Sequence, residues 1–539
     1  MITAGAVAQA LAEAGIQKAF GLPGGEVLVL IDELRKVGID FVLMRHEANA
    51  GIAAAVYGKL TRQAGVVIAT LGPGAANLLL PVANAYLDQE PLLAITAQIP
   101  DDFPPLHTHQ LLPLHDTFRP MCKFVEKVTA SNAGHAVREA LATSIDRPYG
   151  ASYLTLSARE AIQAAAVAEN AMPLAMTGRT WEAPEKTRPM AGRAGRAADL
   201  RARCAEAERP LVLIGLGADV RCAGQLRRWL DEWQLPFAVT PKVKGIADET
   251  SPNFVGVISG MAADGLMVEA LQAADLLIGF GLDPVEVDKT WHAELDIQWV
   301  LEARNAANAM PDGAQLVNHS ALLDELLAGG PPRDWGRPFS SFQQRRLELL
   351  KGDPGAPNCM WPGDIIRALA DAVPAETIVT TDVGSHKYLF GQFWPSRHPE
   401  TFWMSNGLSG MAYGLSAAIG AKLARPEAPV LAAVGDGGFS MNAQELETAG
   451  RVGAPFVTVV LEDCSYSLIK LAQENRKLEP YRMDFNPIDN VKMAEACGVP
   501  GIRTSNPDEM ASAVRRAVGQ QTSLVVAVPV DYADYRKLF

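Results

Sequence analysis

Residues 430–438 read Val-Leu-Ala-Ala-Val-Gly-Asp-Gly-Gly, an apolar run that ends in a glycine turn around one aspartate. Five successive apolar residues predict a buried strand, and the glycines allow a sharp turn and the close approach of a ligand. Asp436 therefore lies at the carboxyl end of a strand, which is where open α/β sheets bind their ligands.

A second carboxylate follows the next apolar run. Residues 442–450 have helical spacing, and the run 456–461 leads directly to Glu462 and Asp463. One strand–helix–strand unit would bring Asp436 and Asp463 to the same edge of a parallel sheet. Two hard oxygen ligands beside a glycine turn suit a Mg²⁺ ion that also holds a diphosphate. A Gly-Asp-Gly sequence taken alone is more often an ordinary turn.

The composition predicts a well-packed soluble enzyme. Of its 539 residues, 48% are hydrophobic and 20% are charged. A chain of this length exceeds what one hydrophobic core supports, so we predict about three domains. The net charge of −13 argues against nucleic acid or an anionic membrane as a partner. The sequence has no membrane-spanning run, its N-terminus lacks the pattern expected of a signal peptide, and the six scattered cysteines lack metal-binding spacing. We therefore expect a cytoplasmic protein with reduced thiols.

Apolar runs alternate with helical segments along the whole chain, which predicts an α/β fold of three parallel-sheet domains. The predicted domains span residues 1–165, 185–330 and 355–539, and the segments 171–195, 329–332 and 352–362 are predicted linkers. The predicted strands are 18–20, 41–44, 66–70, 92–96, 153–156, 211–216, 237–240, 276–280, 298–301, 378–381, 430–434, 456–461 and 524–530. The first and third domains look like similar modules.

Glu47 also follows a predicted strand. The stretch Arg45-His46-Glu47 separates residues 41–44 from an alanine-rich helical segment, 49–62. In one interpretation, Glu47 is a solvated acid that the helix dipole favours. In the other, it is buried in an apolar cleft, where the protonated carboxyl is favoured and can serve a ligand nitrogen as a proton donor.

Small residues mark several further turns. Residues 21–25 and 71–74 are glycine turns at the edge where Glu47 is expected; they could simply pack, or they could shape a cleft for a flat ring. In 381–386, free amides at a helix start could receive phosphate oxygens. The loop 405–411 exposes its carbonyls and ends in Met411, which is either a core side chain or a ligand contact. His109 and Gln110 share a loop with two more histidines but have no acidic partner at zinc-binding spacing.

Together these residues resemble the thiamine diphosphate-dependent 2-oxo acid decarboxylases and carboligases, over essentially the whole chain. The family has Gly-Asp-Gly and then an asparagine after the next strand; here Asp436 matches and Asp463 replaces the asparagine. The resemblance implies that Asp436, Asp463 and the carbonyl of Ser465 bind Mg²⁺. It also implies that Glu47 activates the cofactor through its pyrimidine ring. The three domains are then doubly wound, and they are a pyrimidine-binding, a central and a diphosphate-binding domain.

The resemblance also assigns roles in catalysis and binding. Gln110 would face the substrate, because its amide can donate to an oxyanion, and His109 would either polarise the acceptor or bond to the backbone. Met411 would hold the cofactor folded, with carbonyls of the same loop orienting its amino group. Tyr466 and Leu468 would line the pocket, although Leu468 could equally be a core residue. The implied cofactor-binding residues are Gly24, Gly72, Asn77, Gly384, Ser385, His386, Gly407, Ser409, Met411, Gly435, Gly437, Gly438, Tyr466, Ser467 and Leu468.

Within the family, the chain resembles acetolactate synthases in residues 71–77, in His109-Gln110 with Lys123, and in 381–384. Asp463 and the segment 281–286 are similar to the FAD-free catabolic type, so we expect no FAD. The cofactor of this family lies between subunits, which implies a homodimer or homotetramer. Residues 111–116 and 462–464 and Ser467 depart from the acetolactate synthase pattern, and they leave the substrate open.

The resemblance implies a carboligase that decarboxylates pyruvate, or a related 2-oxo acid, and joins the two-carbon unit to an aldehyde or ketone. Three alternatives remain: a decarboxylase or acyloin lyase with a bulkier substrate, a flavin-dependent pyruvate oxidase, and a catalytically silent subunit. The retained Glu47, Asp436, Asp463 and Met411 argue against the silent subunit.

Overall fold

The computed structural model describes residues 1–104, 106, 108–165, 196–258, 260–286, 295–303, 314–532 and 535. The predicted linker 171–195 and His107 lie outside these residues. The chain divides into two compact units, each considered by itself below. The first comprises the described residues of Met1–Lys186 with Ser416–Glu427 and Gln444–Ala454; the second comprises those of Thr187–Leu415 with Ala428–Ala443 and Pro455–Phe539.

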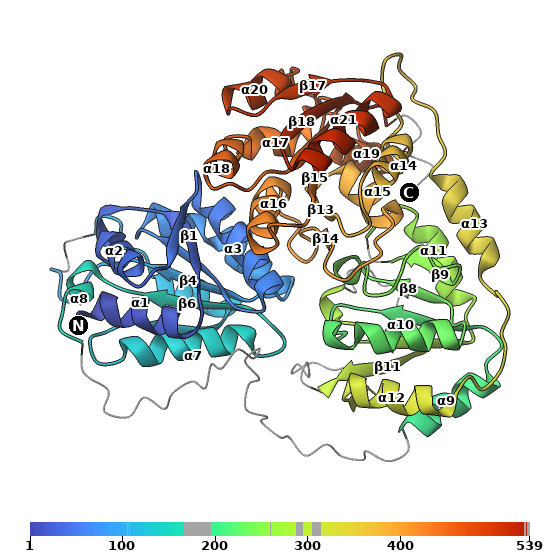
Figure 1. Ribbon diagram of the computed structural model, residues 1–539, viewed down its shortest axis with the longest axis horizontal. Coiled ribbons are helices and arrows are strands. Elements are labelled where there is room, and N and C mark those ends of the chain that lie inside the picture. The colour runs from blue at the N-terminus through green and yellow to red at the C-terminus, as the bar shows by residue number, and fades with distance from the viewer. Residues whose placement is uncertain are drawn as a thin grey trace. The chain divides into compact units, whose positions relative to one another are not determined.

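The first unit contains a six-stranded sheet of order β2-β1-β3-β4-β6-β5. Its strands are β1 (Lys18–Leu22), β2 (Asp40–Leu43), β3 (Gly65–Ala69), β4 (Leu92–Thr96), β5 (Cys122–Lys127) and β6 (Ala151–Thr155). Its helices are α1 (Thr3–Glu13), α2 (Leu28–Lys36), α3 (Glu47–Thr61), α4 (Pro73–Asn77), α5 (Leu79–Leu87), α6 (Leu114–Phe118), α7 (Ala133–Ile145) and α8 (Ala158–Ala161). Helix α1 contacts α2 and α7, and α3 contacts α5, so helices cover both faces (Figure 1).

The second unit contains two further six-stranded sheets. The central sheet has the order β12-β11-β10-β7-β8-β9. Its strands are β7 (Pro210–Ile214), β8 (Phe237–Val239), β9 (Phe254–Val257), β10 (Leu276–Phe280), β11 (Ile297–Glu302) and β12 (Gln315–Val317). Its helices are α9 (Arg196–Glu206), η3 (Val220–Cys222), α10 (Ala223–Glu232), α11 (Asp264–Gln272), α12 (His319–Gly329) and α13 (Ser340–Leu349).

The third sheet has the order β14-β13-β15-β16-β18-β17. Its strands are β13 (Ile378–Thr381), β14 (Phe402–Trp403), β15 (Val430–Gly435), β16 (Val457–Glu462), β17 (Gly501–Arg503) and β18 (Leu524–Pro529). The helices of this part of the chain are α14 (Pro362–Ala372), α15 (Ser385–Phe393), α16 (Tyr413–Ala424), α17 (Asp436–Asn442), α18 (Glu445–Arg451), α19 (Ser467–Asn475), α20 (Asn490–Ala496) and α21 (Pro507–Gln520).

The predicted α/β class is confirmed, because every pairing in the three sheets is parallel and helices flank each sheet. The first and third sheets share one order: if strands are numbered within each sheet, it is 2-1-3-4-6-5 in both. The central sheet has the order 3-2-1-4-5-6 of dinucleotide-binding folds.

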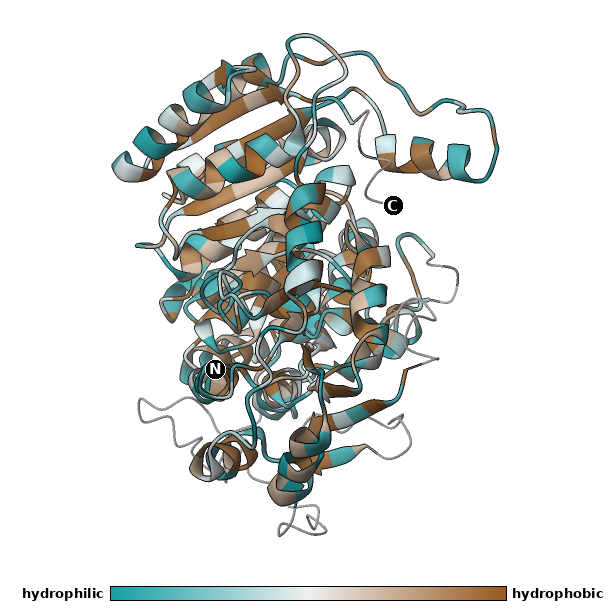
Figure 2. Ribbon diagram, turned by 90° about the vertical axis from the view of Figure 1, so that its right-hand side faces the viewer, coloured by the Kyte–Doolittle hydropathy of each residue, from teal (hydrophilic) through white to brown (hydrophobic). Residues whose placement is uncertain are grey.

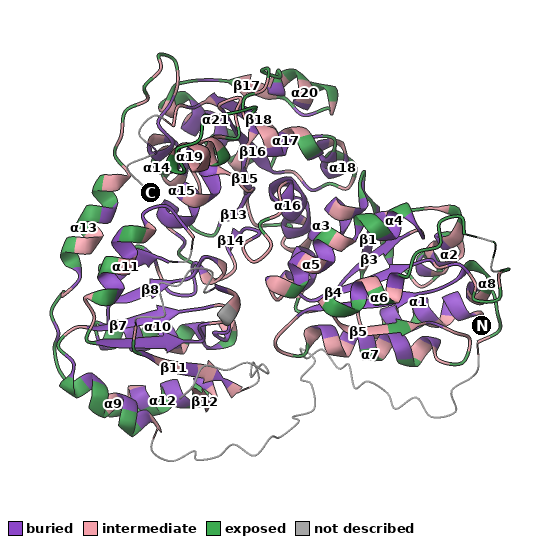
Figure 3. Ribbon diagram, turned by 180° about the vertical axis from the view of Figure 1, so that it is seen from behind, coloured by how far each residue is buried: buried purple, intermediate pink, exposed green. Residues whose placement is uncertain are grey.

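Burial explains why the strands read as apolar runs. Strands β3, β4, β6, β7 and β10 are buried at every residue, as expected of parallel sheets covered on both faces. Figure 3 shows this burial along the strands, and Figure 2 shows apolar strands beneath helices with polar outer faces. No helix in the described part of the chain has both the length and the apolar character needed to cross a lipid bilayer.

The expected helix 442–450 differs from the structure. Helix α17 begins at Asp436, directly after β15, and a short break at 443–444 separates it from α18. The acidic Asp436 in the first turn favours a helix start at this place, because the amino end of a helix carries partial positive charge. Asp436 thus stands at a strand end and a helix start at once.

Candidate active site

Glu47 is the first residue of α3, and β2 ends only four residues before it. The N-cap residue His46 accepts a hydrogen bond at Nδ1 from Ala48 N at 3.1 Å, which fixes the helix start. Glu47 is only 6% exposed, so within this chain it is not a solvated acid. Its Oε2 accepts a hydrogen bond from Asn77 Nδ2 at 2.9 Å, which brings together two residues that we predicted for the site.

Glu445, in α18, holds the start of α3 from the other side. Its Oε1 accepts hydrogen bonds from Arg45 N at 3.0 Å and from Asn49 Nδ2 at 2.9 Å, and Glu445 is fully buried. These two donors flank Glu47 in the sequence. Glu445 could not be predicted from the sequence, because nothing in the local pattern of α18 shows that its carboxylate meets a helix some 400 residues away.

The glycine turns of the first sheet lie close to predicted site residues. Gly72 has a φ of +57°, and a Cβ there would lie 2.9 Å from Cβ of Gln110. A Cβ at Gly24 would lie 2.5 Å from Cβ of Thr70, at the end of β3. Gln110 and His109 are exposed. The structure therefore brings Gln110 to the turn that precedes Asn77.

The two aspartates among the three predicted metal ligands both accept hydrogen bonds from backbone amides. Asp436 Oδ1 accepts from Gly437 N, and Oδ2 accepts from Cys464 N, both at 2.8 Å. Asp463 Oδ1 accepts from Ser465 N at 3.4 Å, and Oδ2 accepts from the hydroxyl of Ser467. Asp436 is 5% exposed. The loop after β16 therefore turns back over the end of β15, as the spacing of the two aspartates predicts.

The electrostatics of this pair favour a cation. Burial, opposed by the hydrogen bond from Ser467 and assisted by the charge of Asp436, raises the pKa of Asp463 to about 7. Burial also raises the pKa of Asp436. No three His, Cys, Asp or Glu side chains gather in metal-binding geometry among the described residues. Two carboxylates and a carbonyl leave coordination positions for phosphate oxygens, which is the donor set that Mg²⁺ accepts.

Ser385 and His386 begin α15 and present two buried polar atoms without hydrogen-bond partners, Ser385 Oγ and His386 Nε2. A Cβ at Gly435 would lie 3.0 Å from Cε1 of His386, so this ring lies against the turn before Asp436. Burial lowers the pKa of His386 to about 3. A phosphate group would accept a hydrogen bond from each atom and would favour the protonated ring. The residues present therefore fit a diphosphate.

Small residues in the glycine turn allow close contacts that larger ones would prevent. A Cβ at Gly437 would lie 2.9 Å from Cε1 of Tyr466, which is itself 44% exposed. A Cβ at Gly384 would lie 2.8 Å from Cε1 of His386. Leu468, the second residue of α19, packs against the core of the second unit, which supports the core interpretation of this residue.

The loop before α16 carries Gly407, Ser409 and Met411. Ser409 and Ala412 have left-handed backbone conformations, with φ of +57° and +64°. Such a conformation costs a non-glycine residue about 1–3 kcal/mol of conformational free energy. Ser405 Oγ accepts from Gly410 N at 3.0 Å, which fixes the loop internally. Met411 is only partly buried, so it is no ordinary core methionine.

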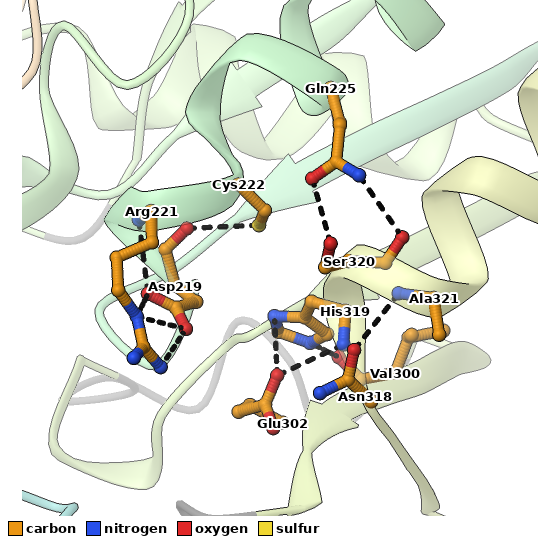
Figure 4. A network of polar contacts seen from close by, with 10 residues as sticks. All are labelled: Asp219, Arg221, Cys222, Gln225, Val300, Glu302, Asn318, His319, Ser320 and Ala321. Atoms are coloured by element: carbon orange, nitrogen blue, oxygen red, sulfur yellow. Dashed lines mark hydrogen bonds and ion pairs between the residues drawn. The ribbon is translucent and has the colours of Figure 1, made fainter. Parts of the chain in front are cut away.

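A separate polar cluster lies in the central domain (Figure 4). His319 N donates to Glu302 Oε2 at 2.9 Å, and the His319 ring stacks on Phe280 with centroids 4.1 Å apart. Nearby, Arg221 in η3 pairs with Asp219 at 2.6 Å. His319 and Glu302 are both buried, and together they fasten the start of α12 to the end of β11. This cluster serves the fold and is unrelated to the predicted site residues.

Comparison with known families matches the two domains that carry the predicted site residues. The model of the N-terminal TPP binding domain of thiamine pyrophosphate enzymes matches residues 1–117, and that of the C-terminal TPP binding domain matches residues 382–528. The model of the central domain of the same enzymes matches residues 198–320. The chain belongs to the thiamine pyrophosphate enzymes. Glu47 and Asn77 lie in the first match, and Asp436 and Asp463 lie in the last.

Individual thiamine pyrophosphate enzymes align with nearly the whole chain. An acetolactate synthase of Bacillus subtilis is 29% identical over 98% of this chain and 93% of its own length. A catabolic acetolactate synthase of Raoultella terrigena is 28% identical over 96% of this chain and 93% of its own. The acetolactate synthase isozyme 3 large subunit of Escherichia coli is 28% identical over 98% and 95%. The chain is thus an acetolactate synthase-like enzyme dependent on thiamine pyrophosphate (thiamine diphosphate).

Proposed function

We propose that this enzyme is a Mg²⁺-dependent carboligase that decarboxylates pyruvate, or a related 2-oxo acid, and joins the two-carbon unit to a second carbonyl compound. The observation that carries the proposal is the buried carboxyl of Glu47, held by Asn77, in a chain that also carries the Asp436–Asp463 pair. A buried, oriented carboxyl serves proton transfer, and the aspartate pair serves a metal-bound diphosphate.

Glu47 would hold a proton toward the pyrimidine nitrogen of the cofactor. Asn77 Nδ2 donates to Oε2, which leaves Oε1 for this task. A Cβ at Gly74 would lie 3.4 Å from Oε1, so the glycine leaves that oxygen uncovered by a side chain. Glu445 contributes by fixing the first turn of α3, which sets the position of Glu47.

Asp436, Asp463 and the carbonyl of Ser465 would hold Mg²⁺, and Ser385 and His386 would receive the phosphate oxygens. Thiamine diphosphate, when bound, supplies a nucleophilic carbon and an electron sink for the loss of CO₂. Met411 would press the cofactor into its folded shape, with the carbonyls of Gly407 and Ser409 facing its amino group. Gln110 would donate a hydrogen bond to the substrate oxygen, and the exposed His109 would act on the acceptor.

The relatives named acetolactate synthases support pyruvate as both donor and acceptor. Incubation with pyruvate, Mg²⁺ and thiamine diphosphate, followed by acid treatment, is expected to yield acetoin, because acid decarboxylates 2-acetolactate. An aldehyde-coupled NADH assay over a panel of 2-oxo acids runs beside it as the test of the alternative. Aldehyde release from a bulkier 2-oxo acid, with no acetoin at any pH, would establish the decarboxylase or acyloin lyase instead.

We also propose that FAD plays no part. Dinucleotides bind in such sheets where the strand order reverses, here at the ends of β7 and β10, and the carboxyl of Glu286 binds the turn after β7. Its Oε2 accepts from Leu216 N at 2.8 Å, its Oε1 accepts from the Thr240 hydroxyl, and Glu286 is 1% exposed. Burial raises the pKa of Glu286 to about 8. These residues do not fit a dinucleotide diphosphate, which needs the amide that Glu286 occupies.

The purified enzyme is therefore expected to be colourless, without flavin absorbance and with full activity when no FAD is added. Flavin released by denaturation in an amount equal to the subunits would refute this and would favour a pyruvate oxidase. The matched measurement is titration of the intact protein with FAD, followed by flavin fluorescence, which should show no saturable quenching.

We further propose a homodimer, or a pair of dimers, with each cofactor shared between the first unit of one subunit and the second unit of its partner. Glu47 and the Asp436–Asp463 pair fall in different units, so a complete site needs both.

All six cysteines are free thiols, which fits the expected cytoplasmic location.

A further inference from the structure

Asp382 is a fully buried carboxylate that directly follows β13. Its Oδ1 accepts hydrogen bonds from Val383 N at 2.8 Å and from Tyr413 N at 3.2 Å. Its Oδ2 accepts from Ala412 N at 3.0 Å. One carboxylate therefore joins the start of the β13–α15 turn to the residues that directly follow Met411.

The segment that Asp382 holds contains two residues in a strained backbone conformation. Ser409 and Ala412 both have left-handed backbones, which non-glycine residues adopt only when the surroundings enforce them. Asn442 Nδ2 donates to Ala412 O at 2.8 Å, while Asp382 takes the N–H of the same residue. Ala412 is thus fixed at both its polar groups, and Met411 is attached directly to it.

The same carboxylate also meets the first turn of α17, which carries the proposed metal ligand Asp436. A Cβ at Gly438 would lie 1.9 Å from Asp382 Oδ2, so the absence of a side chain at Gly438 is what admits this oxygen. Lys387, in the first turn of α15, is 2% exposed and donates from Nζ to Ser409 Oγ at 3.1 Å. Three segments converge on Asp382: the β13–α15 turn, the Met411 loop and the Gly435–Gly438 turn.

We propose that Asp382 is a positioning residue that sets Met411 and the carbonyls of its loop relative to the diphosphate-binding turns. The proposal rests on the proposed use of thiamine diphosphate. Asp382 touches neither cofactor nor substrate in this assignment; it acts through the backbone of Ala412 and Tyr413. The alternative is that Asp382 merely caps α16 and contributes only to folding.

Asp382→Asn tests the proposal with little change of volume. The amide oxygen can replace one carboxylate oxygen, but the amide NH₂ faces an N–H donor and cannot accept from it. In the cofactor-free protein, hydrogen exchange measured by mass spectrometry on a peptide covering residues 404–415 is expected to accelerate about tenfold. With Mg²⁺ and thiamine diphosphate, kcat is expected to fall about 10- to 100-fold with KM for the 2-oxo acid nearly unchanged, since a misplacement near 1 Å costs that much.

Thr380→Val is the matched control. Thr380 Oγ1 donates to Gly414 O at 2.8 Å, so this variant removes a buried bond between the same strand and the same helix without touching Ala412. It should lower the unfolding temperature and leave kcat unchanged. Equal losses of kcat in both variants, or unchanged exchange in Asp382→Asn, would overturn the proposal and leave a purely structural role.

A second variant keeps the proposal testable if Asp382→Asn folds poorly. Gly438→Ala drives a Cβ into Asp382 Oδ2 and should loosen the same peptide while Asp382 is retained. In an Asp382→Ala background the same change should have little further effect on exchange; an equal effect in both backgrounds contradicts the proposal. Calorimetric titration of the wild type with thiamine diphosphate and Mg²⁺ tests the proposed function separately from the positioning role of Asp382. Failure to bind would end the proposed function, whereas the exchange result concerns the loop alone.

Discussion

Replacing Glu47 by glutamine is expected to lower kcat by about 10²- to 10⁴-fold, the usual contribution of general acid–base catalysis. Glutamine keeps the shape and can still accept the hydrogen bond from Asn77, but it cannot hold an acidic proton toward the pyrimidine nitrogen. The affinity for thiamine diphosphate should change little, because the diphosphate is bound by other residues. Steady-state kinetics and calorimetric titration of the cofactor measure the two effects.

Glu13→Gln is the control for this change, since Glu13 lies at the end of α1 with its side chain 52% exposed. It should retain wild-type kinetics. Full turnover by Glu47→Gln would show that the mechanism assigned to Glu47 is wrong. A loss of cofactor binding in parallel with kcat would instead make Glu47 a binding residue.

Asp436→Ala is expected to weaken Mg²⁺-dependent binding of thiamine diphosphate by more than about 100-fold. Substitutions of residues that only support metal ligands already lower metal affinity about 10- to 100-fold. Asp436 is assigned as a ligand itself, so its loss should cost more. The variant also removes the acceptor for Cys464 N, which orients the loop carrying Asp463. Calorimetry with thiamine diphosphate over a series of Mg²⁺ concentrations measures the loss. Glu269→Ala, which breaks an exposed ion pair with Arg345 in the central domain, should bind normally.

Mixing the two inactive variants tests where the complete site lies. In a mixed dimer, the chain with Glu47→Gln still has Asp436, and the chain with Asp436→Ala still has Glu47. If each site takes one half from each subunit, random reassociation should restore about one quarter of the wild-type activity per subunit. No recovery, in a mixture shown to exchange subunits, would mean that each site is completed within one chain.

The interior of each sheet could be predicted from the sequence, but most edge strands could not. Predicted strands 92–96, 276–280 and 378–381 agree with β4, β10 and β13 at both ends, because strands buried on both faces read as unbroken apolar runs. The strands that were missed all lie at sheet edges: β5, β9, β12, β14 and β17. β5 contains two lysines and a glutamate, and β14 has two residues, so neither gives an apolar signal.

Site residues likewise divide into those that local sequence predicts and those whose partners lie far away in the chain. The places of Glu47 and Asp436 in the fold could be predicted because each lies within four residues of the end of a strand, a relation visible within ten residues of sequence. Glu445 could not, since its partners Arg45 and Asn49 are reached only through the folded chain. The bonds from Asp382 to Ala412 and Tyr413 likewise span about 30 residues and depend on left-handed turns that no local pattern announces.

The shared 2-1-3-4-6-5 order of the first and third sheets has an evolutionary consequence. A glycine-rich segment follows the third strand in both sheets: residues 71–74 follow β3, and residues 435–438 lie at the end of β15. Such correspondence is what duplication of one ancestral gene segment leaves behind. We infer that the two domains descend from one duplicated segment; in the proposed function, one copy handles a proton and the other binds an anion.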